Sequence, residues 1–249
     1  MSRRRFLIAA VATLLTAQGS AEPQPRIAII IDDLGYQLEA GRRAIQLPGP
    51  ITFAVLPWTP HSRRLAGFAH DRGKEVLMHL PLEAVNYEGP AEPGGVTLDM
   101  SRDVFRTTFA NAIETVPFAI GVSSHRGSLL TRHPGHMTWL MQEISERDDL
   151  FFIDSYTTPE SIALKVAAEE GVCATRRDVF LDHDRSIEAV ARELERLKAL
   201  ARRKGHAVAI GHPFPETLEV LERELPKLAA EGIELVTISA LLHAEMNRT

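Results

Sequence analysis

The chain has 249 residues, 45% of them hydrophobic and 24% charged, with a net charge of −5 at pH 7. This is the composition of a globular domain, and a single α/β barrel ordinarily has this length. The charges are interspersed without a basic stripe, which argues against nucleic acid as a partner. Cys173 is the only cysteine, which excludes an intramolecular disulfide; we expect it to be a buried apolar filler.

Residues 1–21 have the layout of an export signal. Three arginines at positions 3–5 precede an apolar run at 6–17, and small residues end at Ala21, after which we expect cleavage. The apolar run is too short for a comfortable membrane span, although an uncleaved anchor is the alternative. We therefore expect an exported, periplasmic protein with no stable membrane span once the signal is removed.

The export route stays open between two pathways. The string from Ser2 to Leu7 resembles a twin-arginine motif, but three arginines also suit an ordinary Sec signal. Both routes lead out of the cytoplasm. Residues 22–25 are expected to form a short linker, and 26–249 a single domain.

Short apolar runs alternate with helical patterns through the rest of the chain. The runs, several of them β-branched as in parallel strands covered on both faces, are 26–31, 52–56, 75–78, 118–122, 150–153, 208–210 and 235–238, with a weaker one at 172–175. Helical spacing appears at 61–72, 101–115, 134–147 and 186–204. The last of these is the clearest helix, with Ser186 as a candidate N-cap and Gly205 just past its end. Seven or eight such alternations predict a wound α/β sheet, open or closed into a barrel.

Ionisable residues follow five of these apolar runs: Asp32 with Asp33, then His79, His125, Asp154 and His212. Each alone is as readily a turn or cap residue as part of a site. Because the carboxyl ends of parallel strands meet at one end of a barrel, we expect the set to form a single polar site there.

The residue types in this set suit hydrolytic chemistry. The adjacent carboxylates of Asp32 and Asp33 are not expected to point the same way, so one would bind a metal and the other accept a proton. Two histidines would complete the metal site and leave a position open for water, whose pKa the metal lowers. His212 is suited to protonating a leaving group. The sequence has no serine-hydrolase elbow, phosphate-binding P-loop or dinucleotide fingerprint.

The polar residues lie in strings that resemble the divergent branch of the polysaccharide deacetylases. In chain order, the strings are 30–36 (IIDDLGY), 73–83 (GKEVLMHLPLE), 121–128 (GVSSHRGS), 152–155 (FIDS), 178–182 (DVFLD) and 209–213 (AIGHP). They span nearly the whole chain after the signal, and their order and spacing make the resemblance specific.

The resemblance implies a distorted (β/α) barrel of seven or eight mostly parallel strands, of the NodB-like type. It also implies a divalent metal, zinc above all, and removal of acetyl groups from an N-acetylated glycan. By the same resemblance, Asp32 is the general base, Asp33 and His79 are metal ligands, and His212 is the acid that protonates the leaving amine.

The chain departs from the wider family at two places. Glu83 stands where the wider family has a second histidine, so the third ligand is either Glu83 or His125. We favour His125, because the divergent branch carries a histidine in this block, although usually after asparagine, where this chain has Ser124. The arginine-proline motif of the wider family is absent.

Two residues near the expected site have open roles. Asp154 either orients a neighbouring site residue or caps the next helix, and Trp58 either stacks on a sugar ring or plugs the barrel mouth. The loop at 86–95 is expected to border the site. The alternatives to a deacetylase are an inactive barrel that binds glycan or a protein, and a metal hydrolase with another substrate.

Overall fold

The computed structural model describes residues 24–87, 89, 92–147 and 150–246. The expected export signal at 1–21 lies outside these ranges, as does the first part of the linker. Within them, no helix is long and apolar enough to cross a membrane.

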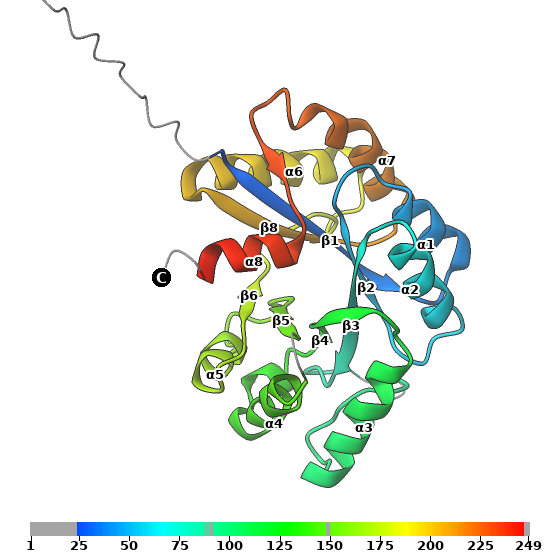
Figure 1. Ribbon diagram of the computed structural model, residues 1–249, viewed down its shortest axis with the longest axis vertical. Coiled ribbons are helices and arrows are strands. Elements are labelled where there is room, and N and C mark those ends of the chain that lie inside the picture. Colours follow the sequence, from blue (N-terminus) through cyan, green and yellow to red (C-terminus); the bar gives the residue numbers. More distant parts are fainter. Residues whose placement is uncertain (1–23, 88, 90–91, 148–149, 247–249) are drawn as a thin grey trace, which may run out of the picture.

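A curled, parallel β-sheet forms the centre of the molecule (Figure 1). Its strands run in the order β6-β5-β4-β3-β2-β1-β8-β7, and β9 pairs separately with the start of β1. The strands are β1 (Arg26–Leu34), β2 (Thr52–Val55), β3 (Glu75–Leu82), β4 (Ala119–Arg126), β5 (Phe151–Asp154), β6 (Ala174–Arg176), β7 (Val179–Phe180), β8 (His206–Gly211) and β9 (Glu234–Leu235). Every pairing is parallel, which confirms the expected distorted β/α barrel.

Helices surround the curled sheet on its outer side, and α8 lies across one of its ends (Figure 1). They are α1 (Leu38–Ile45), α2 (Ser62–His70), α3 (Arg102–Glu114), α4 (Pro134–Ser145), α5 (Ala163–Glu169), α6 (Ile187–Lys204), α7 (Pro215–Glu224) and α8 (Ile238–Met246), with short 3₁₀ turns η1 (Leu130–Arg132) and η2 (Leu225–Lys227). Helix α6 begins and ends as predicted. The Ser186 hydroxyl accepts from the Ala189 N–H, and Gly205 takes the left-handed conformation at φ 88°.

Alternate strand residues belong to two separate cores. In β1, Ile27, Ile29 and Ile31 pack in the larger core under the outer helices, whereas Ala28 and Ile30 pack in the smaller core inside the curl. The inner core is closed at one end by Ile238, Leu241 and Leu242 of α8. Because side chains alternate between the two faces of a strand, this parity decides which later residues point into the barrel.

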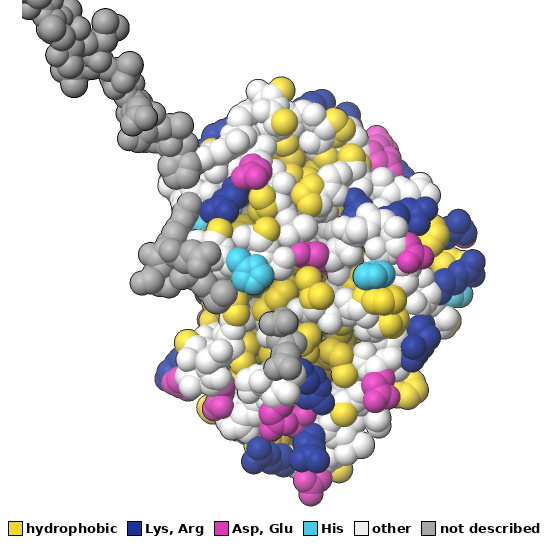
Figure 2. Space-filling model, in the orientation of Figure 1, with side chains coloured by type: hydrophobic (Ala, Val, Ile, Leu, Met, Phe, Trp, Pro, Cys, Tyr) yellow, Lys and Arg dark blue, Asp and Glu magenta, His cyan; other side chains and the backbone are white. Residues whose placement is uncertain are grey.

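The face that carries α8 shows hydrophobic side chains near its middle and most charged side chains toward its rim (Figure 2). This is the end at which the strands start, since Arg26 of β1 pairs with Glu234 of β9 close before α8. The polar residues expected to form a site therefore lie at the opposite end of the barrel.

Two predicted elements differ from the structure. The run at 235–238 is not a strand throughout, because β9 ends at Leu235 and Ile238 already begins α8. Strand β9 pairs only with Arg26 and Ile27 of β1, and β2 pairs with the same edge of β1 from Ile30 onward. Strand β7 is the second difference, because the sequence pattern does not predict it. Only its two residues, Val179 and Phe180, pair with β8. So short a segment has no period to recognise.

Candidate functional site

The site begins where β1 leaves its regular geometry. Asp32 continues the inward parity of Ala28 and Ile30 and is buried inside the barrel. Asp33 would point outward in a regular strand, but its backbone has φ 61°, and the pairing with β2 shifts register between Ile31 and Leu34. This turn brings the second carboxylate back to the inside. The expectation that the adjacent carboxylates point apart is therefore wrong.

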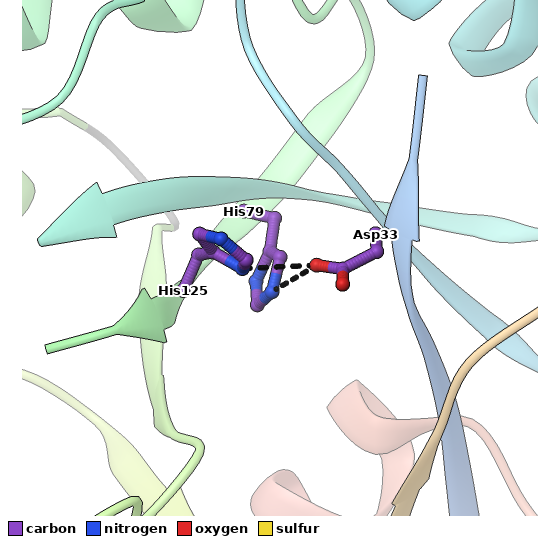
Figure 3. A group of neighbouring side chains, drawn as sticks. All are labelled: Asp33, His79 and His125. Atoms are coloured by element: carbon purple, nitrogen blue, oxygen red, sulfur yellow. Dashed lines mark ion pairs between the residues drawn. The ribbon is translucent and has the colours of Figure 1, made fainter. Parts of the chain in front are cut away.

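Both carboxylates approach the same imidazole. Nε2 of His79 lies 3.5 Å from Oδ2 of Asp32 and 3.3 Å from Oδ1 of Asp33. Nδ1 of His125 lies 2.9 Å from the same Oδ1 of Asp33 (Figure 3). Asp33, His79 and His125 each offer one ligand atom, and these atoms lie within 4.8 Å of one another. Three strands thus bring one oxygen and two nitrogens together.

This group has the chemistry of a metal site. Oδ1 of Asp33 is buried and has no hydrogen bond of good geometry among the described residues, and neither does Oδ1 of Asp32. Buried carboxylate oxygens that accept no well-aligned hydrogen bond are rare, because burial without compensation is costly. Two imidazoles and a carboxylate are also ligands that zinc accepts, with a fourth position left for water. The residues present therefore fit a divalent metal.

The electrostatics of the ligand group point the same way. Burial alone would raise the pKa of Asp33, but the imidazoles of His125 and His79 outweigh it and hold this pKa well below its usual value. Burial opposes protonation of His125, yet Asp33 and Glu92 raise its pKa to about 9. The Asp33 carboxylate therefore stays negatively charged, and a positive charge beside it, from a protonated histidine or a metal ion, stabilises it.

His79 is held by a hydroxyl on the neighbouring strand. Its Nδ1 lies 2.7 Å from Oγ of Ser123, and the two residues are direct partners in the β3–β4 pairing. When Nδ1 carries the proton and donates it to Ser123, the lone pair of Nε2 faces the two aspartates. His79 is therefore oriented to bind a metal through Nε2.

His212 follows β8 and is held by a buried aspartate. Oδ1 of Asp182 lies 2.9 Å from Nδ1 of His212, while Oδ2 accepts from the His212 backbone N–H at 2.6 Å and from the Thr217 hydroxyl at 2.8 Å. Burial opposes protonation of His212, but Asp182, and then the charges of Asp33 and Asp32, raise its pKa. Nε2 of His212 faces the site, 3.7 Å from Oδ2 of Asp33.

Asp32 occupies the most enclosed position of the site. Burial raises its pKa, and the nearby imidazoles of His79 and His212 counteract this only in part. Its Oδ2 accepts a long hydrogen bond of 3.5 Å from the Ser155 hydroxyl. A carboxylate whose pKa is raised toward neutrality is a better proton acceptor than an ordinary one.

The other residues predicted near the site are placed as follows. Ser124 lines the same pocket, where its hydroxyl accepts from the Ser155 N–H at 3.0 Å. Oε2 of Glu83 accepts from the Leu98 N–H at 2.7 Å, so Glu83 fastens the loop after β3 and is not part of the ligand group. Trp58 is 53% exposed and lines a different pocket from the one that holds the site.

Asp154 has the opposite parity from the site residues. Ile153 packs in the inner core, so Asp154 points away from it. Its Oδ1 accepts from the Tyr156 N–H at 2.8 Å and its Oδ2 from the Ser161 hydroxyl at 2.6 Å. Asp154 was expected either to orient a site residue or to cap the next helix. Its contacts resemble a cap, but the groups that it accepts from lie in the loop after β5 and not in a helix.

Sequence reasoning missed the supporting residues Ser123, Ser155 and Asp182. Each has the inward parity of its strand, two residues after Gly121, Ile153 and Phe180 respectively. This parity is a usable signal, because the last inner-core residue of several strands is followed by a polar residue two positions later, as in Ile30 and Asp32 or Leu77 and His79. The signal fails for Asp182, because β7 has only two residues and shows no strand pattern in the sequence.

The site opens into two adjoining hollows. One, of about 520 Å³, is lined by Asp32, Asp33 and four histidines (His79, His125, His183 and His212), with Arg177 on its wall. The other, of about 590 Å³, is lined by Tyr36, Phe214 and Arg185. Asp33 and His212 line both, so the polar group lies where the two hollows meet.

Known proteins resemble this chain in sequence and in fold. "Uncharacterized protein YibQ" of Escherichia coli (strain K12) is 37% identical over 240 residues, which are 96% of this chain and 74% of that protein. The uncharacterized protein ATU2773 from Agrobacterium tumefaciens C58 has a similar structure, with a TM-score of 0.84 at 24% identity over 90% of this chain and 91% of that one.

A more distant structure shares the fold as well. BA3943 from Bacillus anthracis, described as a CE4 family pseudoenzyme, has a TM-score of 0.51 at 17% identity over 88% of this chain and 66% of that one. Residues 29–242 match the family model described as "Divergent polysaccharide deacetylase", which confirms the resemblance found in the sequence. The chain belongs to the divergent polysaccharide deacetylase family.

Proposed function

We propose that the protein is a metal-dependent hydrolase that removes acetyl groups from an N-acetylated glycan. The observation that carries this proposal is the convergence of Asp33, His79 and His125, with Asp32 and His212 beside them. Zinc is the metal we expect, because two imidazoles and one carboxylate suit it. Bound there, it would lower the pKa of a water molecule and polarise the amide carbonyl.

The remaining chemistry belongs to side chains of the chain. Asp32, whose pKa is raised by burial, would accept the proton of the attacking water at its carboxylate. His212, whose pKa Asp182 raises, would donate the proton at Nε2 to the leaving amine. The hydrogen bond between Asp182 and Nδ1 ensures that Nε2 is the nitrogen that faces the substrate.

The adjoining hollows support a glycan as the substrate. A sugar chain would run along both, with its acetamido group at the junction lined by Asp33 and His212. Tyr36 is 53% exposed beside this junction and offers a ring face for a sugar. We further propose that the protein acts outside the cytoplasm, where the sequence of residues 1–21 would direct it; fractionation of cells that express the full chain tests this.

The test measures metal content and acetate release together. We expect the unaltered protein to hold roughly one zinc per chain. Asp33→Ala and His79→Ala should each lose it, because each removes a ligand. Asp32→Asn should keep the zinc and lose acetate release from N-acetylated glycan oligomers. Asp154→Asn is the matched control, because the Asp154 carboxylate is also buried but points away from the inner core. This variant should bind as much zinc as the unaltered protein.

The second candidate is a barrel that binds glycan without turnover. The pseudoenzyme BA3943 shares this fold, so the fold by itself does not imply catalysis. Zinc binding and glycan binding without acetate release would favour this candidate. Unchanged zinc content in Asp33→Ala and His79→Ala would refute the metal site itself, and release of phosphate or of a peptide amine would indicate another substrate.

A further inference from the structure

Glu92 brings a carboxylate from the loop between β3 and α3 to the outer edge of His125. Its Oε2 lies 3.1 Å from Nε2 of His125, while Asp33 lies 2.9 Å from Nδ1 on the other side of the ring. One imidazole is thus bracketed by two carboxylates. The side chain of Glu92 is only 17% exposed, so water competes weakly for this contact.

Contacts within and beyond the loop hold Glu92 in this position. Oε1 of Glu92 accepts from Nε of Arg126 at 2.8 Å, and the Arg126 guanidinium lies over the ring of Tyr87, 4.0 Å from its centre. The backbone carbonyl of Glu92 accepts from the Gly95 N–H at 2.8 Å. Glu92 is therefore fixed by its backbone and by both carboxylate oxygens.

The two histidines of the ligand group are oriented through opposite nitrogens. His79 meets Ser123 through Nδ1 and turns Nε2 to the aspartates, whereas His125 meets Glu92 through Nε2 and turns Nδ1 to Asp33. An imidazole that donates one N–H binds a metal only through its other nitrogen. A carboxylate at Nε2 thus keeps the proton there and frees the Nδ1 lone pair.

We propose that Glu92 is a positioning residue that fixes the tautomer and ring orientation of His125 for metal binding. This inference rests on the proposed function, since it takes His125 as a ligand. Partners of this kind behind ligating histidines typically contribute about 10–100-fold to metal affinity.

The experiment compares zinc affinities, using zinc alone and a chromophoric chelator as competitor. Glu92→Ala should weaken zinc binding about 10–100-fold, and Glu92→Gln by less, since the amide oxygen still accepts from Nε2. Glu160→Gln is the matched control. Oε2 of Glu160 lies 2.7 Å from Nε of Arg132, but this side chain is 60% exposed and is not in the ligand group. The Glu160→Gln variant should therefore bind zinc with the same affinity as the unaltered protein. The free energy of unfolding in excess chelator shows whether each variant folds normally.

Each outcome separates the two proposals. Weaker zinc binding in Glu92→Ala, with intermediate binding in Glu92→Gln and normal folding of both, supports the positioning role. Equal affinity of Glu92→Ala and the unaltered protein overturns it and leaves the metal site intact. If the unaltered protein binds no zinc, the metal-dependent function fails, and the role of Glu92 fails with it.

Discussion

Replacement of Asp182 by alanine tests the hydrogen-bonded unit that holds His212. The Asp182 side chain is fully buried and accepts from the His212 backbone N–H, His212 Nδ1 and the Thr217 hydroxyl. The variant leaves all three donors without their acceptor. A buried donor without a partner costs about 1–3 kcal/mol. The His212 ring is 16% exposed and would recover part of its loss through water, but Thr217 is fully buried.

We therefore expect Asp182→Ala to lower the free energy of unfolding by about 3–5 kcal/mol, as is usual when one partner of a buried charged pair is removed. Thr217→Val should cost only about 1 kcal/mol by itself, because Asp182 keeps two donors. In the Asp182→Ala background, Thr217→Val should cost nothing further, since the hydroxyl has already lost its acceptor. The two effects should thus be non-additive by about 1 kcal/mol.

The loss should also depend on pH. The pKa of His212 is raised in the folded chain, so its protonation stabilises the fold fully below about 6.5, the ordinary histidine value. This contribution disappears as the pH rises through the raised value. Asp182→Ala removes the main cause that raises the pKa, so it should destabilise more at pH 6 than at pH 9.

Urea unfolding followed by circular dichroism, in excess chelator and at both pH values, measures these quantities. A loss below about 1 kcal/mol for Asp182→Ala, or strict additivity with Thr217→Val, would refute the three-donor account. An equal loss at pH 6 and pH 9 would refute the link to protonation of His212. If Asp182→Ala fails to fold, Thr217→Val alone still tests the reasoning, since its loss should be close to 1 kcal/mol.

Three further substitutions, one of them a control, test the supporting structure. Gly35→Ala should lower the free energy of unfolding by about 3 kcal/mol or more, because φ is +140° and a Cβ there would overlap Oγ1 of Thr59. Gly67→Ala is its control within helix α2, where a Cβ meets nothing within 4 Å, and urea unfolding should show a gain of about 0.5–1 kcal/mol. Ser123→Ala removes the partner of His79 Nδ1 and should weaken zinc affinity at least about 10-fold by chelator competition; a change within twofold would contradict the orienting role.

The sequence by itself determined the fold class and most of the polar group. Continuous apolar runs alternating with helical patterns imply a wound parallel sheet, because only such a sheet is covered on both faces. In such a sheet, the residues that follow successive strands gather at one end without any further information. Asp32, His79, His125 and His212 were predicted to meet for this reason, although they are far apart along the chain.

Only the tertiary structure decided how these residues face one another. The backbone of Asp33 at φ 61° brings both carboxylates to one imidazole, and no local pattern predicts this conformation for an aspartate. The sequence also left Glu83 and His125 open as the third ligand, and only the family resemblance favoured His125. The structure separates them, because Glu83 is engaged by the Leu98 N–H, while His125 has the inward parity of Ser123 on β4.

The sequence does not predict which distant partner each site residue contacts. Asp182 precedes His212 by 30 residues and meets it only because β7 pairs with β8. Glu92 meets His125 across 33 residues through an irregular loop. Local periodicity places residues on faces of strands, but hydrogen bonds between distant segments depend on register and loop course, which packing of the whole barrel fixes.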